Sequence, residues 1–419
     1  MTTRRTLLRA ILLESLVPVA QVFPQSGSDE PRSLQHPSGP YAVGRAGFHW
    51  TDPNRPDRAA TDPASHRELM VYLWYPASSS AATSRAPYLP GAKEMDADPA
   101  LQARMRDEFG AYWPSIVSGA FSSNASEGAQ VIAKPSRLPV VLFSHGNGST
   151  GFDYTSLIED LASHGFVVAV IEHTHIAVAV RFPDGRVVPF HKEKFPEGLS
   201  RAERFERMMK SAAAGIAEGA ADVGFVKARL AELNDTDHGQ FPLAGRLDLK
   251  HIVAMGHSAG GAIATRACQL DSGLAACANL DGGMPPVAVL PVFPDRAVMK
   301  QPLLLVEPRT TEHSVAATKE QLREYLQKKE QQLQSCVPGT YHVTLTAPGI
   351  AHPSFSDTPI FFAGSQGYPP IQAVRHNHVL IQSVVRAFLG KTFKGTKAPL
   401  LDGPAQAHPE ASVQRYGHL

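Results

Sequence analysis

Short apolar runs alternate with longer helix-like stretches through most of the chain beyond Leu138. The apolar runs are Leu138–Ser144, Phe166–Glu172, Ile252–Met255, Ala276–Leu280 and Pro302–Val306. Strands that are apolar on both faces belong to parallel sheets that helices cover on both sides. The pattern therefore predicts an α/β fold with a mostly parallel central sheet covered by helices on both faces.

Four stretches between and after these runs have the composition or the apolar spacing of helices. They are Tyr154–His164, Ala202–Asn234, Ser314–Ser335 and His376–Leu389. In the second of them, apolar residues recur at helical spacing, at Val223, Val226, Leu230 and Leu233. That part is expected to pack on the sheet.

The N-terminal part and the tail have a different pattern. Tyr41–Trp50 and Glu68–Tyr75 have strand character, and an Asp- and Pro-rich segment joins them, so we expect an antiparallel pair of strands. Pro99–Phe109 is predicted to be a short helix. Ser122–Ala129 is expected to be polar, flexible chain, and Lys397–Leu419 is expected to wrap the surface.

The first 27 residues have the features of an export leader. Thr3–Leu8 looks like a twin-arginine signal, and the mostly apolar segment Ala10–Ala20 follows it. Glu14 interrupts this segment, and Ala20 is the best candidate for the cleavage site. We expect an exported protein, periplasmic or secreted; the alternative is a disordered start.

Composition narrows the class of protein. The chain has 419 residues, 43% of them hydrophobic, which allows a sizeable core. We expect one main domain at 28–395, after the leader at 1–27 and before a tail at 396–419. The net charge is 40 − 39 = +1, and no basic stripe with interleaved aromatic residues points to a nucleic-acid partner. No apolar run approaches the roughly 20 residues that span a bilayer.

The three cysteines argue against a metal or cluster site. Cys268, Cys277 and Cys336 form no C-x-x-C pair, the usual spacing for zinc or iron–sulfur ligands. Because free cysteine is among the most buried residue types, we expect buried thiols in preference to a single disulfide.

The candidate chemistry centres on Gly256–Gly260, where the apolar run Ile252–Met255 turns into a helix start. This is the G-x-S-x-G pattern between a strand and a helix, which marks Ser258 as a candidate nucleophile. The glycines have no Cβ to collide across so sharp a turn. The helix that follows aims its N-terminal N–H groups at charge that develops beside the serine.

A serine nucleophile needs a base, and the base needs a carboxylate to orient it. In open α/β sheets such groups gather beyond the carboxyl ends of the strands. Asp281 directly follows Ala276–Leu280 and is the first candidate for the acid, while Glu307, just after Pro302–Val306, is its rival.

His352 is the candidate base, because it follows the Tyr341–Ala347 strand and comes after the acid in the chain. Five other histidines are weaker candidates. His376 and His378 straddle a predicted helix start and are expected at the surface; His173 and His175 could be a metal pair, but no third ligand is in view. His257 is expected to support the nucleophile.

Two backbone N–H groups should bind the oxyanion. One is that of Ala259, the residue after the nucleophile. The other should come from the glycine-containing loop His145–Gly148, where Asn147 is the expected donor and Gly148 competes with it. This chemistry requires no cofactor.

With these motifs the chain resembles the plasma-type platelet-activating factor acetylhydrolases and their bacterial relatives, within the α/β-hydrolase superfamily. The matching stretches are GPYAVG at Gly39–Gly44, LWYP at Leu73–Pro76, FSHGNG at Phe143–Gly148, DLASHGFVVAVIEH at Asp160–His173, LDLKHIVAMGHSAGG at Leu247–Gly261, LDGG at Leu280–Gly283 and AH at Ala351–His352. The resemblance implies a triad of Ser258, Asp281 and His352, and a cofactor-free hydrolysis of short acyl groups from phospholipids.

The sequence departs from the family pattern at two places beside the site. Ala259 replaces a bulkier Phe after the nucleophile, and Asn147 replaces an apolar residue in the oxyanion loop. From the motifs and the resemblance together, we expect a serine ester hydrolase that acts on a small-molecule or lipid ester and makes transient contact with a lipid surface. The alternatives are a broad carboxylesterase, including polyester or cutinase-like activity, and a hydrolase fold reused as a binding module. A dienelactone-hydrolase-like reaction would normally need Cys at 258.

Overall fold

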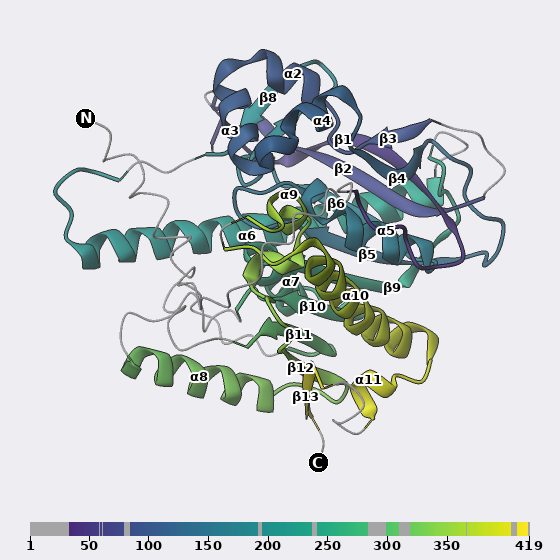
Figure 1. Cartoon of the computed structure of the whole chain (residues 1–419), viewed down its shortest axis with the longest axis vertical. Helices are drawn as coiled ribbons and strands as arrows, with labels where there is room; N and C mark the ends of the chain where they lie inside the picture. Colours follow the sequence, from purple (N-terminus) through teal and green to yellow (C-terminus); the bar gives the residue numbers. More distant parts are fainter. Residues whose placement is uncertain are drawn as a thin grey trace.

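The computed structural model describes residues 33–57, 59–60, 62–78, 84–191, 195–236, 241–283, 299–309, 319–365, 367–403 and 409–417. These residues form an eleven-stranded sheet with helices packed against it (Figure 1). In spatial order its strands are β13 (Ala411–Tyr416), β12 (Thr340–Leu345), β11 (Leu303–Pro308), β10 (Ala276–Leu280), β9 (Leu247–His257), β5 (Leu138–Ser144), β6 (Val167–Glu172), β2 (His66–Ala77), β1 (Ala42–Pro56), β4 (Ser122–Glu127) and β3 (Arg85–Pro87). A separate hairpin pairs β7 (Ala179–Arg181) with β8 (Val187–Pro189).

The strands from β12 to β6 are mutually parallel, and β2 and β1 add an antiparallel pair beside β6. The predicted mostly parallel sheet with its N-terminal antiparallel pair is confirmed. Since the strands run the same way, the residues just after β5, β9, β10 and β12 lie at one edge of the sheet. That edge carries the predicted site.

Helices cover both faces of the sheet. They are α2 (Ala92–Ala97), α3 (Pro99–Phe109), α4 (Trp113–Ser118), α5 (Thr155–Ser163), α6 (Arg201–Thr236), α7 (Ala259–Leu270), α8 (Lys319–Gln334), α9 (Thr358–Phe362), α10 (Ile371–Lys394) and α11 (Pro399–Asp402). Val141 and Phe143 of β5 face the core under α5 and α10, whereas Val140 and Leu142 face the core under α6 and α7. In Figure 1, α10 lies in front of the sheet, and the N-terminal half of α6 extends away to the left.

Two expectations for polar segments were wrong. Within Ser122–Ala129 the structure has β4, whose Ser126 pairs with Gly44 of β1. The polar strand is tolerated because the buried carboxylate of Glu159 accepts hydrogen bonds from the Ser123 hydroxyl and from the backbone N–H of Asn124 (2.8 Å) and Ala125 (3.0 Å). Such a contact between segments far apart in the chain leaves no trace in local composition.

The tail also differs from the expectation of a surface wrap. Its residues Ala411–Tyr416 form β13, which pairs antiparallel with β12 as an edge strand of the sheet. The helix predicted at His376–Leu389 begins earlier, at Ile371, so His376 and His378 lie inside α10. His376 is exposed, but His378 is buried, which corrects its placement at the surface.

The remaining expectations concern cysteines and the leader. Cys268, Cys277 and Cys336 are free and buried, as expected. The predicted leader at 1–27 lies outside the described residues.

The turn after β9 packs directly against the carboxyl end of β5. A Cβ added at Gly260 would lie 2.0 Å from the carbonyl oxygen of Ser144, and one at Gly256 would lie 2.3 Å from the carbonyl oxygen of Gly260. Both neighbours are backbone atoms, which cannot rotate out of the way. Glycine is therefore required here for close approach.

We expect Gly260→Ala to lower the free energy of unfolding by about 3 kcal/mol, because the added methyl group overlaps backbone on the neighbouring strand. Gly224→Ala is the matched control: it lies in α6 with no atom within 4 Å of the added Cβ. It should raise the free energy of unfolding by about 0.5–1 kcal/mol, since Ala is the better helix former. Urea unfolding midpoints of both variants measure this, and equal midpoints would contradict it.

Candidate active site

Ser258 stands between β9 and α7 with an unusual backbone. Its φ is 56° and its ψ is −125°, a conformation that costs a non-glycine residue about 1–3 kcal/mol. Hydrogen bonds hold it in place: its N–H donates to the carbonyl of Leu280 (2.9 Å), and its own carbonyl accepts from the N–H of Gly261 (2.9 Å). The half-buried side chain is thereby turned out of the sheet towards the candidate base.

The structure brings Ser258, His352 and Asp281 together. His352 opens a single 3₁₀ turn after β12, and its Nε2 lies 3.0 Å from the Ser258 Oγ. Its Nδ1 lies 2.6 Å from Oδ2 of Asp281. Asp281 follows β10 with a φ of 51°, and its N–H donates to the carbonyl of Val306 (2.7 Å). This geometry suits a proton on Nδ1 facing the carboxylate and a free lone pair on Nε2 facing the hydroxyl.

The site is open to solvent, yet its acid is largely sheltered. The His352 side chain is 44% exposed, whereas that of Asp281 is 20% exposed. Burial raises the pKa of the Asp281 carboxyl above its ordinary value, against the lowering effect of the hydrogen bond from His352. A weakly solvated carboxylate interacts more strongly with a positive charge on the adjacent ring than a fully hydrated one does.

Glu307, the rival acid, is engaged elsewhere. Its Oε2 accepts hydrogen bonds from Lys329 Nζ (2.7 Å) and from His342 Nε2 (2.8 Å). Burial would raise its pKa, but these two partners outweigh burial and lower the pKa to about 2. Of the two candidate carboxylates, only Asp281 contacts His352.

In the candidate oxyanion loop His145–Gly148, the amides of both glycines are held in hydrogen bonds, whereas that of Asn147 is not. The N–H of Gly146 donates to the Tyr154 hydroxyl (3.0 Å), and that of Gly148 donates to the carbonyl of Ile176 (2.8 Å). Within the described part of the chain, the N–H groups of Asn147 and Ala259 have no hydrogen-bond acceptor. Gly148 is therefore not available as the competing donor, and Asn147 is.

A second Ser–His–Asp array, which sequence reasoning missed, lies buried behind this loop. His173 Nε2 is 2.9 Å from the Ser144 Oγ, and His173 Nδ1 is 2.9 Å from Oδ2 of Asp222. Arg67 donates to the same carboxylate at 2.7 Å, and the side chains of His173, Asp222 and Arg67 are all 0% exposed. Burial would raise the pKa of Asp222, but Arg67 and His173 lower it below its ordinary value.

This array has no access to substrate, so its geometry alone does not make a second active site. It holds the loop instead, because the backbone N–H of His173 also donates to His145 Nε2 (3.2 Å). His175 points to a different partner, with its Nε2 2.9 Å from Asp57 Oδ2, so the two histidines do not form the metal pair considered from the sequence. No motif marks Asp222, which lies far along the chain in α6.

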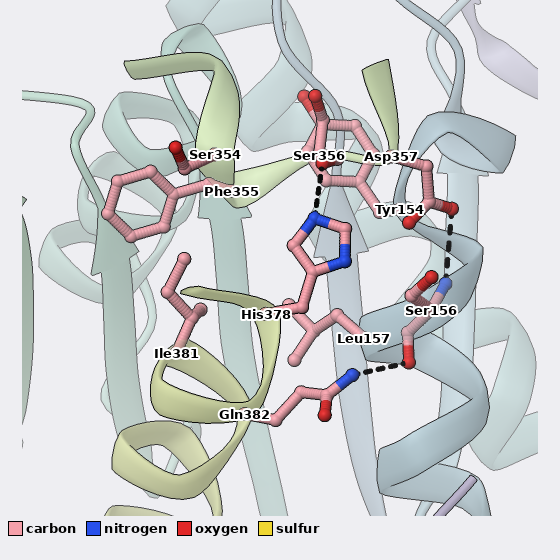
Figure 2. A pocket seen from close by; sticks show the side chains of 10 residues that line it. All are labelled: Tyr154, Ser156, Leu157, Ser354, Phe355, Ser356, Asp357, His378, Ile381 and Gln382. Atoms are coloured by element: carbon pink, nitrogen blue, oxygen red, sulfur yellow. Dashed lines mark hydrogen bonds between the residues drawn. The ribbon is translucent and has the colours of Figure 1, made fainter. Parts of the chain in front are cut away.

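The segment that follows His352 is anchored to two helices around a small cavity (Figure 2). His378 Nε2 of α10 donates to the carbonyl of Ser356 (3.0 Å), and Oδ2 of Asp357 accepts from the N–H of Ser156 (3.1 Å). Gln382 Nε2 donates to the carbonyl of Ser156 (3.0 Å). Burial raises the pKa of Asp357 to about 8, which disfavours the charged form of this carboxyl.

Comparison with known proteins adds a family to this geometry. A sequence model of the family described as platelet-activating factor acetylhydrolase, isoform II, matches residues 26–185 and 222–365. A probable 1-alkyl-2-acetylglycerophosphocholine esterase from Arthroderma benhamiae is 28% identical over 188 residues, which cover 42% of this chain and 47% of the relative. The platelet-activating factor acetylhydrolase of Cavia porcellus is 28% identical over 161 residues, 36% of each chain. The chain thus aligns with less than half the length of these curated relatives.

A solved structure matches over nearly its whole length. The ferulic acid esterase from Streptomyces cinnamoneus is similar with a TM-score of 0.67 and 26% identity, and the match covers 91% of this chain and 99% of that one. The similarity supports the predicted α/β-hydrolase fold.

Substitutions of Asp281 and Glu307 should have different effects, the first on kcat and the second on stability. We expect Asp281→Asn to lower kcat about 10³–10⁴-fold, because the amide no longer holds the His352 tautomer that can accept a proton from Ser258. Glu307→Gln should leave kcat of the folded protein nearly unchanged and lower the free energy of unfolding by on the order of 1–3 kcal/mol at neutral pH. Steady-state kinetics and urea unfolding measure the two effects.

The effect of Glu307→Gln on the free energy of unfolding should depend on pH. A carboxyl whose pKa falls to about 2 on folding stabilises the folded state above its unfolded pKa and loses that effect as pH falls. The stability difference between wild type and Glu307→Gln should therefore be full above about pH 4.5 and shrink towards pH 2. A large kcat loss in Glu307→Gln with none in Asp281→Asn would reverse the assignment of the acid.

Proposed function

The chain belongs to the family described as platelet-activating factor acetylhydrolase, isoform II, and on that premise we propose that it is a serine ester hydrolase. It acts through an acyl-enzyme and releases short acyl chains from phospholipid-like esters. The observation that carries the proposal is the 3.0 Å separation of the Ser258 Oγ from His352 Nε2, with Asp281 on the other ring nitrogen. A hydroxyl is a poor nucleophile at neutral pH unless a base so placed accepts its proton.

In the first half-reaction the Ser258 Oγ attacks the ester carbonyl carbon while His352 Nε2 takes the hydroxyl proton. Asp281 orients the ring and stabilises the imidazolium that forms. The carbonyl oxygen becomes an oxyanion, which accepts hydrogen bonds from the N–H groups of Asn147 and Ala259. When the tetrahedral intermediate collapses, the carbon–oxygen bond to the leaving alcohol breaks, and that oxygen takes the proton from His352.

In the second half-reaction water replaces the alcohol. His352 takes a proton from the water as its oxygen attacks the acyl carbon, and the same two amides hold the second oxyanion. Collapse breaks the bond to the Ser258 Oγ, which regains its proton from His352, and the free acid leaves. Every proton is accounted for by His352, so the cycle needs no metal or cofactor.

Two substrate ranges follow from the proteins that resemble this chain. The acetylhydrolase and acetylglycerophosphocholine esterase names of the curated relatives support a phospholipid-like ester. The ferulic acid esterase, which this chain matches over 99% of that protein's length, supports the alternative of a broader carboxylesterase. A phospholipid substrate also implies transient contact with a lipid surface; among the described residues no helix combines the length and apolarity needed to cross a membrane.

We also propose that residues 1–27 direct export. The arginine pair Arg4-Arg5 is the part of a twin-arginine signal that its receptor reads. We expect the double variant R4K/R5K to stay in the cytoplasm with its N-terminus intact. The wild type should be recovered outside the cytoplasm with a new N-terminus just after Ala20. Cell fractionation and N-terminal sequencing test this, and equal export of both forms would contradict a twin-arginine route.

Activity itself is tested with p-nitrophenyl esters from acetate to palmitate and, alongside them, a platelet-activating-factor analogue. We expect hydrolysis of the short esters and of the analogue, lost by at least about 10³-fold in Ser258→Ala. A fluorescent phosphonate should label the wild type at Ser258 and leave Ser258→Ala unlabelled.

The outcomes separate the candidate functions. Hydrolysis of simple esters without hydrolysis of the analogue would favour the broad carboxylesterase. A folded wild type that neither hydrolyses any ester nor takes the phosphonate would favour a hydrolase fold reused as a binding module.

A further inference from the structure

One buried hydroxyl joins the oxyanion loop to the nucleophile turn. Tyr154, 2% exposed, ends the 3₁₀ turn Gly151–Tyr154 that precedes α5. Its hydroxyl oxygen accepts a hydrogen bond from the N–H of Gly146 (3.0 Å) and lies 2.9 Å from Nδ1 of His257. Gly146 neighbours the candidate donor Asn147, and His257 neighbours Ser258. The Tyr154 side chain therefore contacts Gly146 and His257, the residues that precede Asn147 and Ser258. The Asn147 amide and the Ser258 hydroxyl must both reach the same substrate carbonyl.

The direction of one of these hydrogen bonds is fixed. A backbone N–H can only donate, so the Tyr154 oxygen accepts from Gly146, whereas the tautomer of His257 sets which partner donates between Tyr154 Oη and His257 Nδ1. Burial, together with the neighbouring His352, lowers the pKa of His257 well below its ordinary value, so its ring is neutral. Burial also raises the pKa of Tyr154, which keeps the hydroxyl protonated.

A neutral His257 also suits the base beside it. The ring centroids of His257 and His352 are 4.5 Å apart, and His257 stacks on Phe355 at 5.4 Å with an interplanar angle of 21°. When His352 takes a proton, a charged His257 at this distance would oppose the new charge. The hydrogen bond with Tyr154 occupies Nδ1, one of the two nitrogens of this ring.

Packing sets the position of the Tyr154 ring independently of its hydroxyl. The ring centroids of Tyr154 and Phe143 are 4.9 Å apart, and both side chains belong to the same buried hydrophobic cluster. A Cβ at Gly146 would be 3.1 Å from the Tyr154 Oη and 3.5 Å from the Cβ of Ser258, so loop, hydroxyl and nucleophile turn are in close contact. Removing only the hydroxyl would leave the ring in place and two buried polar groups, Gly146 N–H and His257 Nδ1, without a partner.

We propose that Tyr154 is a positioning residue, whose hydroxyl fixes the spacing between the Asn147 amide and Ser258 through Gly146 and His257. This inference rests on the proposed esterase function. Donors of an oxyanion hole act when they lie within about 2.7–3.1 Å of the developing charge, and a displacement of about 1 Å can cost about 100-fold in rate. The loss should fall on kcat, because the ester is an oxyanion only in the transition state.

The test compares two tyrosine-to-phenylalanine changes. Tyr154→Phe removes the bridging hydroxyl, and Tyr75→Phe is the matched control. Tyr75 is likewise fully buried, and its hydroxyl donates to the carbonyl of Ala129 (2.7 Å), away from the site. We expect Tyr154→Phe to lower kcat on p-nitrophenyl acetate about 10–100-fold with KM changed less than about 3-fold. Tyr75→Phe should lower thermal stability by a similar amount and leave kcat within about 2-fold of wild type.

A second pair of variants keeps the test decisive if Tyr154→Phe folds poorly. His257→Asn can place its amide group near the former Nδ1 and hydrogen-bond to Tyr154 as either donor or acceptor, whereas His257→Leu cannot. We expect His257→Asn to retain about 10-fold more of the wild-type kcat than His257→Leu. Equal kcat in these two variants would contradict the bridge.

The rate at which a phosphonate labels Ser258 provides a second readout that does not depend on the ester chosen. It should fall in Tyr154→Phe and not in Tyr75→Phe, because phosphonylation uses the same hole. A Tyr154→Phe variant as active as wild type, or no less active than Tyr75→Phe, overturns the positioning role while leaving the esterase proposal intact. A wild type that neither hydrolyses esters nor takes the phosphonate overturns the esterase proposal, and the positioning role with it.

Discussion

The structure around Ser258 depends on how closely the turn after β9 approaches the end of β5. The Ser144 carbonyl occupies the space that a side chain at Gly260 would fill, and the Gly260 carbonyl does the same for Gly256. This contact places the loop that carries Asn147 beside Ser258 and brings Tyr154 within reach of both Gly146 and His257. The strained backbone of Ser258 persists because hydrogen bonds to Leu280 and Gly261 hold it on two sides.

The two arrays of a carboxylate, a histidine and a serine in this fold contain the same kinds of hydrogen-bonded groups and differ in their exposure to solvent. His352, paired with Asp281, has its Nε2 3.0 Å from the Ser258 Oγ. His173, paired with Asp222, has its Nε2 2.9 Å from the Ser144 Oγ. The side chains of Asp222 and His173 in the second array are fully buried, Arg67 pairs with Asp222, and the backbone N–H of His173 contacts His145 in the loop after β5. Glu307 is likewise held by Lys329 and His342, which removes it from His352.

Local sequence patterns predicted secondary structure correctly where a segment's own residues determine whether it is buried or exposed. The apolar runs became β5, β6, β9, β10 and β11, because a strand without a polar face must be covered on both sides. Patterns failed where polar residues are paired over long distances. Ser122–Ala129 was expected to be flexible, but Glu159 satisfies its polar groups and it contains β4. His378 was expected at the surface, but it is buried against the carbonyl of Ser356.

The order of motifs along the chain was sufficient to predict the fold class and to name Ser258 as a candidate nucleophile with a short list of candidate acids and bases, since steric need and strand-end placement are local rules. Choosing between Asp281 and Glu307, or between the amides of Asn147 and Gly148, required knowing which groups already have partners from remote segments. Tyr154 and Asp222 lie in no motif, and His173 ends the matching stretch Asp160–His173 without a role that the stretch itself reveals. The contacts of Tyr154 with Gly146 and His257, and those of His173 with Ser144 and Asp222, exist only once β5, β6, β9 and α6 have packed together, because hydrogen bonds between distant segments are a property of the folded chain.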